Sequence, residues 1–179
     1  PRVRRQRQMC IRDRGAYRSI GINRNDFMAL LQMRPDQPEE SRAVEWVAYA
    51  SNAFNSMVPF YANVERTPEY LANTTGTVST DNFYWTSRLI AAMADASYNK
   101  SLFHLERYEE AVLSAGRALV NQYDAKLAAE PDAARRAALR EEANTAIAAM
   151  LQEKAADTLD KVLFELSSQM KNAYSRSDA

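Results

Sequence analysis

Apolar residues are densest between Ser41 and Val64, where the sequence reads SRAVEWVAYASNAFNSMVPFYANV. Successive side chains of a strand point to opposite faces. An extended segment here therefore carries apolar residues on both faces: Val44, Trp46, Ala48 and Ala50 on one, and Val47 and Tyr49 on the other. The pattern predicts a strand that is covered on both sides and on which the rest of the chain docks. Pro59 has no amide hydrogen, which places the second half, MVPFYANV, at an edge or a bend of the sheet.

A strand pair is predicted just upstream of this segment. The order is YRSIGI, then the polar turn NRND, then FMALLQMR, in which apolar residues occupy both faces until Gln32 and Arg34. The connection RPDQPEES, with two prolines and several acidic residues, is expected to be solvated. With VEWVAYA next in the chain, three antiparallel strands with both faces covered are expected within residues 15–64.

Helical spacing replaces strand alternation after residue 79. Ser79, Thr80 or Asp81 is expected to cap a first helix. Its buried side is predicted to carry Phe83, Tyr84, Leu89, Ile90 and Met93. A second helix is predicted after SYNKS, because apolar residues recur there at alternating spacings of three and four. They are Leu105, Tyr108, Val112, Ala115 and Leu119.

The last third of the chain predicts one long helical region. The tripeptide EPD ends the preceding helix and starts the next, with Pro131 in its first turn. A single helix from there to about Tyr174 would be roughly 65 Å long at 1.5 Å per residue, so a bend or a split is expected. The Ala-rich first part is expected to project or to pair with its neighbour, and the part from Leu159 to dock on the sheet. Strands followed by helices over residues 79–176 predict an α+β fold.

Charge is distributed unevenly, although the formal net charge is +0. The first fourteen residues, PRVRRQRQMCIRDR, hold six Arg and one Asp. Such an arm can bind nucleic acid, with an affinity that falls steeply with salt. Reverse translation of residues 4–13, however, fits the codons CGT CGG CAG CGT CAG ATG TGT ATA AGA GAC, which resemble the mosaic-end adapter of transposase-based sequencing libraries. Residues 1–14 are therefore interpreted as adapter-derived and disordered, and no nucleic-acid partner is predicted.

Candidate chemistry is sparse in this chain. Cys10 is the one cysteine, which excludes an internal disulfide, and its place in the adapter string argues against a role as nucleophile. His104 is the one histidine and has no serine, cysteine or aspartate partner at a meaningful spacing, so a structural or surface role is expected. No metal site or cofactor is predicted. No apolar run approaches the length of about 20 residues that spans a bilayer, so no membrane association is expected either.

Four segments carry a resemblance to a known family. They are YRSIGINRNDFMALLQMRPD, EWVAYASNAFNSMVPFYANV, TPEYLANTTGTVSTDNFYWTSRLIAAMAD and the ending DKVLFELSSQMKNAYSRSDA. Together they resemble the C-terminal part of the C69 family dipeptidases, bacterial enzymes of the N-terminal-nucleophile hydrolase superfamily, related to penicillin V acylase and bile salt hydrolase. The resemblance covers nearly all of residues 17–179, and it is most specific up to about Asp95.

The resemblance implies part of an αββα sandwich and a thiol-dependent hydrolysis of dipeptides, without metal. In this family the nucleophile is a cysteine at the mature N-terminus, so it is expected upstream of residue 15. Residues 15–179 are then the C-terminal part of the dipeptidase domain, inactive alone. One sheet face is expected to lack its partner layer, which would leave Trp46 and Phe60 partly exposed and promote aggregation or dimerisation. A cytoplasmic location is expected, with export of the whole protein left open.

Four residues are candidates for contact with substrate. Asn23 and Arg24 lie in the turn between the first two predicted strands, where a guanidinium can hold a substrate carboxylate through two hydrogen bonds. Asn55 and Tyr61 flank the Pro59 bend and can face a cleft. For all four a plain structural role stays the stronger alternative. A second reading of the whole chain is a non-enzymatic helical module for interaction or oligomerisation, which would not need an apolar three-stranded unit.

Overall fold

The computed structural model describes residues 25–170, except for the side chain of Asn52. Three strands come first: β1 (Phe27–Met33), β2 (Ala43–Tyr49) and β3 (Val58–Tyr61). The helices follow: α2 (Glu69–Ala72), α3 (Phe83–Ala96), α4 (Tyr98–Ala129) and α5 (Ala133–Ser167). The 3-10 turns η1 (Glu39–Ser41) and η2 (Asn52–Phe54) lie between the strands. Strands followed by long helices confirm the predicted α+β class.

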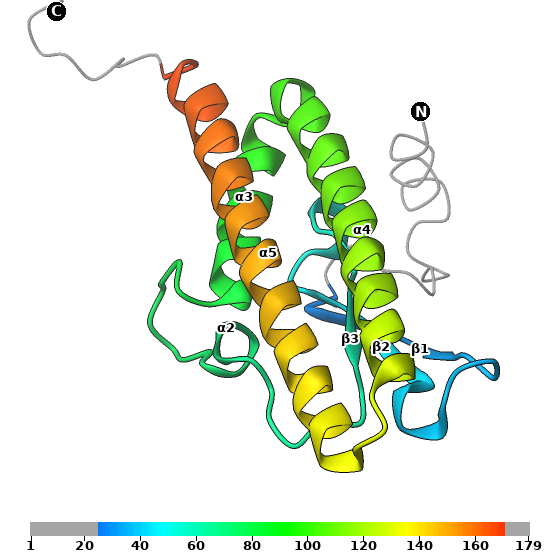
Figure 1. The fold of residues 1–179 in the computed structure, drawn as a ribbon. Helices are drawn as coiled ribbons and strands as arrows, with labels where there is room; N and C mark the ends of the chain where they lie inside the picture. Colours follow the sequence, from blue (N-terminus) through cyan, green and yellow to red (C-terminus); the bar gives the residue numbers. More distant parts are fainter. Residues whose placement is uncertain (1–24, 171–179) are drawn as a thin grey trace, which may run out of the picture.

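The strands form one antiparallel sheet in the order β1-β2-β3. In its register Leu30 lies opposite Trp46, and Trp46 lies opposite Pro59. The antiparallel pairing of FMALLQMR with VEWVAYA is confirmed, and the third described strand, β3, lies in the segment expected at an edge or a bend. The expected strand YRSIGI lies outside the described residues. Figure 1 shows the antiparallel pair of α4 and α5 lying across the sheet, with α3 behind them.

The core fills the space between β2, β3 and the helices. Side chains from all of these elements are fully or almost fully buried there, among them Val44, Val58, Tyr61, Ile90, Val112, Ile147 and Leu151. The second helical stripe was predicted correctly at Leu105, Tyr108 and Val112. Further along α4 the buried line instead passes through Gly116, Val120, Tyr123 and Leu127. The buried residue at this point is therefore Gly116 and not the predicted Ala115. α4 approaches β3 so closely there that a Cβ on residue 116 would lie 2.7 Å from Cδ of Pro59.

β3 is an edge strand of the described sheet, as Pro59 predicts, and α5 closes its outer edge. The side-chain amide of Asn144 accepts a hydrogen bond from Tyr61 N–H at 2.8 Å and donates one to Tyr61 C=O at 3.0 Å. One helical side chain thereby satisfies the two backbone groups that a further strand would have bonded. Arg140, one turn earlier in α5, donates from Nε to the carbonyl of Asn63 at 2.9 Å.

The helix starts differ from the prediction by one residue or more. The cap of α3 is Asn82, whose side chain accepts from Trp85 N–H at 2.9 Å, and not Ser79, Thr80 or Asp81. Asn, Asp, Ser and Thr side chains all accept this bond well. Because Thr80 and Asp81 directly precede Asn82, residue type alone did not identify which of them caps the helix. The break at EPD is confirmed, yet Asp132 is the cap of α5, so Pro131 precedes the first turn and does not lie in it.

Helix α5 corrects two expectations for the last third of the chain. It runs without interruption from Ala133 to Ser167, because no glycine or proline occurs within it, so the expected split was wrong. The order of docking is also the reverse of the prediction. The first half carries Asn144 and meets the sheet, whereas Leu163 and Phe164 near the end are 46% and 69% exposed. The wider apolar stripe therefore did not identify the half that meets the sheet.

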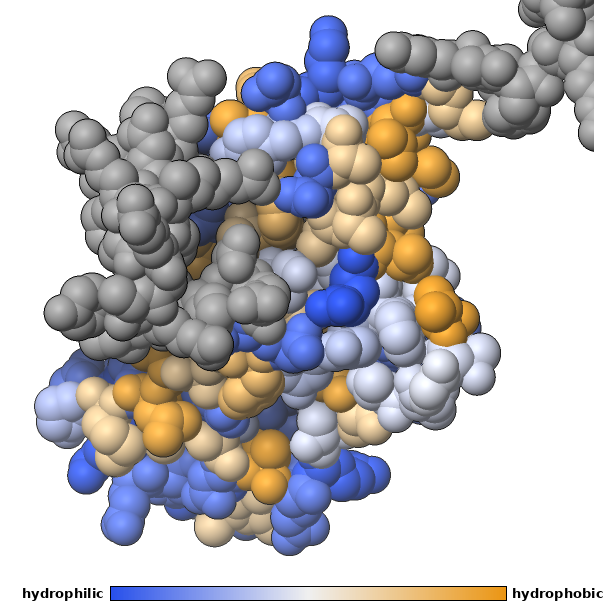
Figure 2. Space-filling model, turned by 180° about the vertical axis from the view of Figure 1, so that it is seen from behind, coloured by the Kyte–Doolittle hydropathy of each residue, from blue (hydrophilic) through white to orange (hydrophobic). Residues whose placement is uncertain are grey.

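The expectation that both faces of every strand are covered is wrong for β1. All seven of its residues are exposed, and Leu31 is 76% exposed. Phe60, by contrast, was expected to be partly exposed and is 7% exposed, while Trp46 is partly buried. Figure 2 shows apolar surface gathered at the lower left, on the side where the sheet lies, and again at the upper right by the end of α5. The exposed apolar surface of the sheet thus belongs to β1 and not to β3.

Candidate functional site

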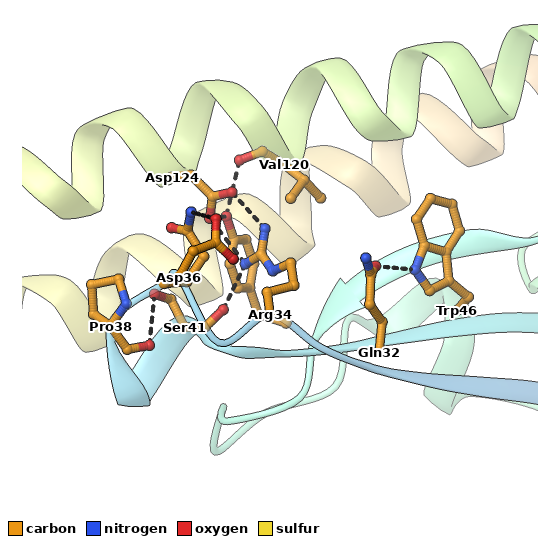
Figure 3. Close-up of polar contacts among 10 residues, drawn as sticks. Gln32, Arg34, Asp36, Pro38, Ser41, Trp46, Val120 and Asp124 are labelled. Carbon is orange, nitrogen blue, oxygen red and sulfur yellow. Dashed lines mark hydrogen bonds and ion pairs between the residues drawn. The ribbon is translucent and has the colours of Figure 1, made fainter.

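A polar cluster joins the end of β1 to α4. The guanidinium of Arg34 donates from Nη1 to Asp124 Oδ2 at 2.5 Å and from Nη2 to Asp124 Oδ1 at 3.1 Å. Nη2 also donates to the carbonyl of Ser41 at 2.6 Å. Figure 3 shows Arg34 and Asp124 facing each other, with Ser41 beside them. Both charged side chains are 13% exposed, so this is a nearly buried pair with two parallel hydrogen bonds.

Tyr61, a predicted substrate contact, is part of this cluster. Its hydroxyl lies 2.7 Å from Asp124 Oδ1 and 3.0 Å from the carbonyl of Val120, and its ring lies 5.7 Å from the Arg34 guanidinium carbon. Burial raises the pKa of Tyr61 far above its ordinary value, and its bond to the Asp124 carboxylate raises it further. The hydroxyl therefore stays protonated and acts as a donor. It cannot serve as a base in this position.

Asn55, the second described candidate, is held in a network of its own. Nδ2 donates to the carbonyl of Tyr49 at 2.5 Å and to Ser87 Oγ at 3.0 Å. Oδ1 accepts from Ser56 N–H at 2.8 Å and from the hydroxyl of Tyr108 at 3.3 Å. These bonds join the end of β2 to α3 and α4. Every donor and acceptor of the amide is used, which leaves none for a substrate in this conformation.

The structure does not bring the four predicted site residues together. Asn23 and Arg24 lie outside the described residues. Asn55 and Tyr61 belong to separate networks, each committed to partners within the fold, so contact of either residue with substrate stays a prediction. His104 makes a contact of 3.4 Å from Nε2 to Glu165 Oε1, between α4 and α5, which agrees with the structural role expected for it.

Sequence reasoning missed the Arg34–Asp124 pair. The partners are 90 positions apart, and neither has a neighbour in the sequence that marks it. The available signal was weak: an arginine directly after an apolar strand, and an aspartate on the same helical stripe as Val120. Three of the five N–H groups of Arg34 are bonded to Asp124 and Ser41, and its buried Nε has no hydrogen-bond partner among the described residues.

An open groove of about 1000 Å³ lies between the loop Asn63–Pro68 and the first half of α5. At its rim Arg66 Nε contacts Glu141 Oε2 at 2.9 Å, and this hydrogen bond holds the pKa of the Glu141 carboxyl below its ordinary value. Arg140 also lines the groove; it is 7% exposed, and its Nη1 has no hydrogen-bond partner among the described residues. The groove therefore carries charge of both signs, and none of the described residues that line it is a cysteine.

The described residues contain no thiol, because the one cysteine of the chain, Cys10, precedes them. They also contain no group of three or more His, Cys, Asp or Glu side chains arranged to hold a metal ion. No helix within residues 25–170 is both long and apolar enough to cross a membrane. What the described part supplies is a sheet, its helical cover and two closed polar networks.

Comparison with known proteins gives a consistent result. The model of peptidase family C69 matches residues 6–111. "Probable dipeptidase A" of Streptococcus pyogenes serotype M18 (strain MGAS8232) is 43% identical over 162 residues, which cover 90% of this chain and 33% of the relative. "Dipeptidase" of Bifidobacterium longum (strain NCC 2705) is 37% identical over 204 residues, which cover 93% of this chain and 38% of the relative. "Dipeptidase A" of Lactobacillus helveticus is 44% identical over 82 residues.

The chain spans between a third and two fifths of the length of the first two of these relatives. The family match begins at residue 6, inside the segment interpreted as adapter-derived. Residues 1–14 lie outside the described residues, so the adapter interpretation stays a prediction.

Proposed function

The chain belongs to peptidase family C69, and from that premise we propose that it is the C-terminal part of a cysteine dipeptidase. The family match over residues 6–111 carries this proposal, and the names of the relatives supply the substrate class, dipeptides. The relatives extend well beyond the matched region, which supports a position of this chain within a longer enzyme.

The proposed chemistry needs a nucleophile that the described residues do not contain. In the proposal a cysteine at the mature N-terminus of the whole enzyme attacks the peptide carbonyl, with its own α-amine as the base. The amine of the second residue leaves with a proton, and an acyl-enzyme forms. Water then attacks the thioester, releases the first residue as its carboxylic acid and restores the thiol. This chain alone is accordingly proposed to be inactive.

The described residues are proposed to provide the scaffold of that enzyme. The network at Tyr61 joins the end of β3 to α4 and α5, and the network at Asn55 joins the end of β2 to α3 and α4. Both hold the sheet against its helical layer. Asn23, Arg24, Asn55 and Tyr61 remain the proposed substrate contacts. The amide of Asn55 would have to give up one of its four hydrogen bonds to bind a substrate.

The three-stranded sheet favours this proposal over a helical interaction module, which has no need of one. We also propose a cytoplasmic location, as expected for many members of the family.

The test is hydrolysis of a dipeptide panel by the enzyme encoded by the full reading frame upstream of Gly15, recovered from independently prepared DNA. We expect hydrolysis that a thiol-alkylating reagent abolishes. Replacement of the N-terminal cysteine by alanine is the matched variant and should lower kcat/KM at least a thousandfold while the protein stays folded. Activity that survives both treatments would refute the thiol mechanism. A frame that encodes RRQRQMCIRDR joined to Gly15 in independent DNA would refute the adapter interpretation.

A further inference from the structure

One arginine of the groove between the loop Asn63–Pro68 and α5 has no acidic partner. Arg140 is 7% exposed, and its Nε donates to the carbonyl of Asn63 at 2.9 Å. This is the only hydrogen bond that its side chain makes within residues 25–170, and its buried Nη1 makes none there. Arg136, one turn earlier in α5, differs, because its Nε pairs with Glu40 at 2.7 Å.

A guanidinium without an anionic partner is unfavourable at this degree of burial. Arginine keeps its charge in proteins, so the cost of burial cannot be relieved by loss of a proton. Nη1 of Arg140 has almost no contact with solvent, so water does not replace the missing acceptor in this conformation. A buried charge is normally paired and fully hydrogen-bonded. The site therefore needs an acceptor that residues 25–170 do not supply.

The lining of the groove favours a singly charged acceptor. Two arginines, Arg66 and Arg140, and three glutamates, Glu65, Glu141 and Glu142, line it. A phosphate, with about two negative charges, would be repelled by this excess of acid, whereas a carboxylate carries one charge. Much of the remaining wall is small or apolar and leaves room for an apolar group beside the carboxylate. This part of the wall consists of Val64, Pro68, Ala137, Ala138, Ala146 and Ala149.

We propose that Arg140 binds a carboxylate in this groove, through two parallel hydrogen bonds from Nη1 and Nη2. The loop Asn63–Pro68 contacts the guanidinium through the carbonyl of Asn63, and it has to shift to admit the carboxylate to Nη1. The carboxylate belongs to a free molecule with an apolar tail or to an acidic side chain of a longer protein, since the chain covers 33% of its Streptococcus pyogenes relative. This inference does not depend on the proposed dipeptidase function.

Titration of the full chain with hexanoate tests the site. Hexanoate has one carboxylate and an apolar tail, and hexanol is the matched probe without a charge. We expect hexanoate, and not hexanol, to shift the Nε–H magnetic resonance signal of Arg140 and the backbone amide signals of residues 63–67. An Arg140 signal that hexanoate leaves in place, or that hexanol moves equally far, would overturn the proposal.

Substitution of the guanidinium tests whether Arg140 holds the carboxylate. Arg140→Gln should weaken hexanoate binding at least about tenfold, as expected for the loss of hydrogen bonds to a charged group. Arg135→Gln is the matched control, because Arg135 lies on the same helix, is half exposed and is paired with Glu142. Circular dichroism checks folding, and Arg140→Lys, which keeps the charge but not the two parallel N–H groups, replaces a variant that does not fold. Unchanged binding by the folded Arg140 variant, or equal weakening by Arg135→Gln, would overturn the assignment.

The chain preceded by its upstream reading frame distinguishes the two sources of the carboxylate. If hexanoate shifts the Arg140 signal there too, the carboxylate comes from a free molecule. If it does not, and the signal already lies where the hexanoate-bound chain has it, an upstream acidic side chain occupies the groove. A signal that lies at its unbound position and does not move would overturn the proposal.

Discussion

The two edges of the sheet differ in how their backbone groups are satisfied. At β3, Pro59 removes one donor, Asn144 bonds the outward N–H and C=O of Tyr61, and α4 packs on the ring of Pro59. At β1, all seven residues are exposed, and none of them is charged or a proline. One edge is thus completed by helices of the same chain, and within residues 25–170 the other is not.

The difference shows what completes a sheet edge in this protein. Apolar character does not, because β1 is as apolar as β3. The closure of β3 comes from a few residues on α4 and α5 that meet the strand at particular positions: a glycine where the backbone comes close, and an amide where two backbone groups need partners. The effects of substitutions should therefore be large on the β3 side and small on β1.

The largest loss of stability is expected from breaking the Arg34–Asp124 pair. Asp124→Ala leaves the Arg34 guanidinium nearly buried without its partner and removes an acceptor of the Tyr61 hydroxyl. Loss of one member of a buried pair costs about 3–5 kcal/mol of unfolding free energy. Urea unfolding measures this loss, with Asp157→Ala on the exposed face of α5 as the control. A loss under about 1 kcal/mol, the usual value for an exposed ion pair, would contradict the near-complete burial of this pair.

Asn144→Leu should follow closely. It leaves the N–H and C=O of Tyr61 without partners inside the protein, and each unsatisfied buried group costs about 1–3 kcal/mol. The expected loss is about 2–4 kcal/mol in urea unfolding. Hydrogen exchange at the Tyr61 amide should accelerate more than at the Val47 amide in the sheet centre. Unchanged exchange at Tyr61 would show that Asn144 does not close this edge.

Gly116→Ala should destabilise by about 1–2 kcal/mol. Alanine normally stabilises a helix by about 1 kcal/mol relative to glycine, but here its Cβ would lie 2.7 Å from Pro59 Cδ, and a proline ring cannot rotate away. The second substitution Pro59→Ala should restore part of the loss in a double-mutant cycle. A stabilising effect of Gly116→Ala alone would mean that α4 lies further from β3 than described.

Leu31→Lys should have the smallest effect, within about 0.5 kcal/mol for the folded monomer. Leu31 is 76% exposed, and exposed positions away from special features tolerate substitution. Thermal unfolding at low protein concentration measures it. A loss of about 2 kcal/mol of unfolding free energy would show that Leu31 is covered within the chain. The two edges of the sheet would then not differ as described.

The strands and most of the helices could be predicted from the sequence because their signals are local. The apolar run in Phe27–Met33 and the missing donor at Pro59 are each read from a few consecutive residues. The roles of Asn144 and Gly116 could not be predicted, because each depends on a contact with a strand that lies far away in the chain. The apolar faces of β1 indicate that this strand needs a partner, but a sequence does not say whether the partner lies in the same chain.

The candidate site was less predictable than the fold. Arginine in a turn next to a strand suggested Arg24. The arginine that the structure shows in a nearly buried pair is Arg34, which is bonded by an aspartate 90 positions later. Asn55 was singled out as a polar residue beside a bend, and its four hydrogen bonds arise only when β2, α3 and α4 come together. Residue type and local position identified a polar residue in each case, but not its partners.

The most direct test of the central claim is dipeptide hydrolysis by the purified chain beside the same chain preceded by its upstream reading frame. The account predicts no hydrolysis above background by the chain alone, and hydrolysis by the extended protein that a thiol-alkylating reagent removes. Thiol-independent hydrolysis by the chain alone, or an inactive but folded extended protein, would contradict it.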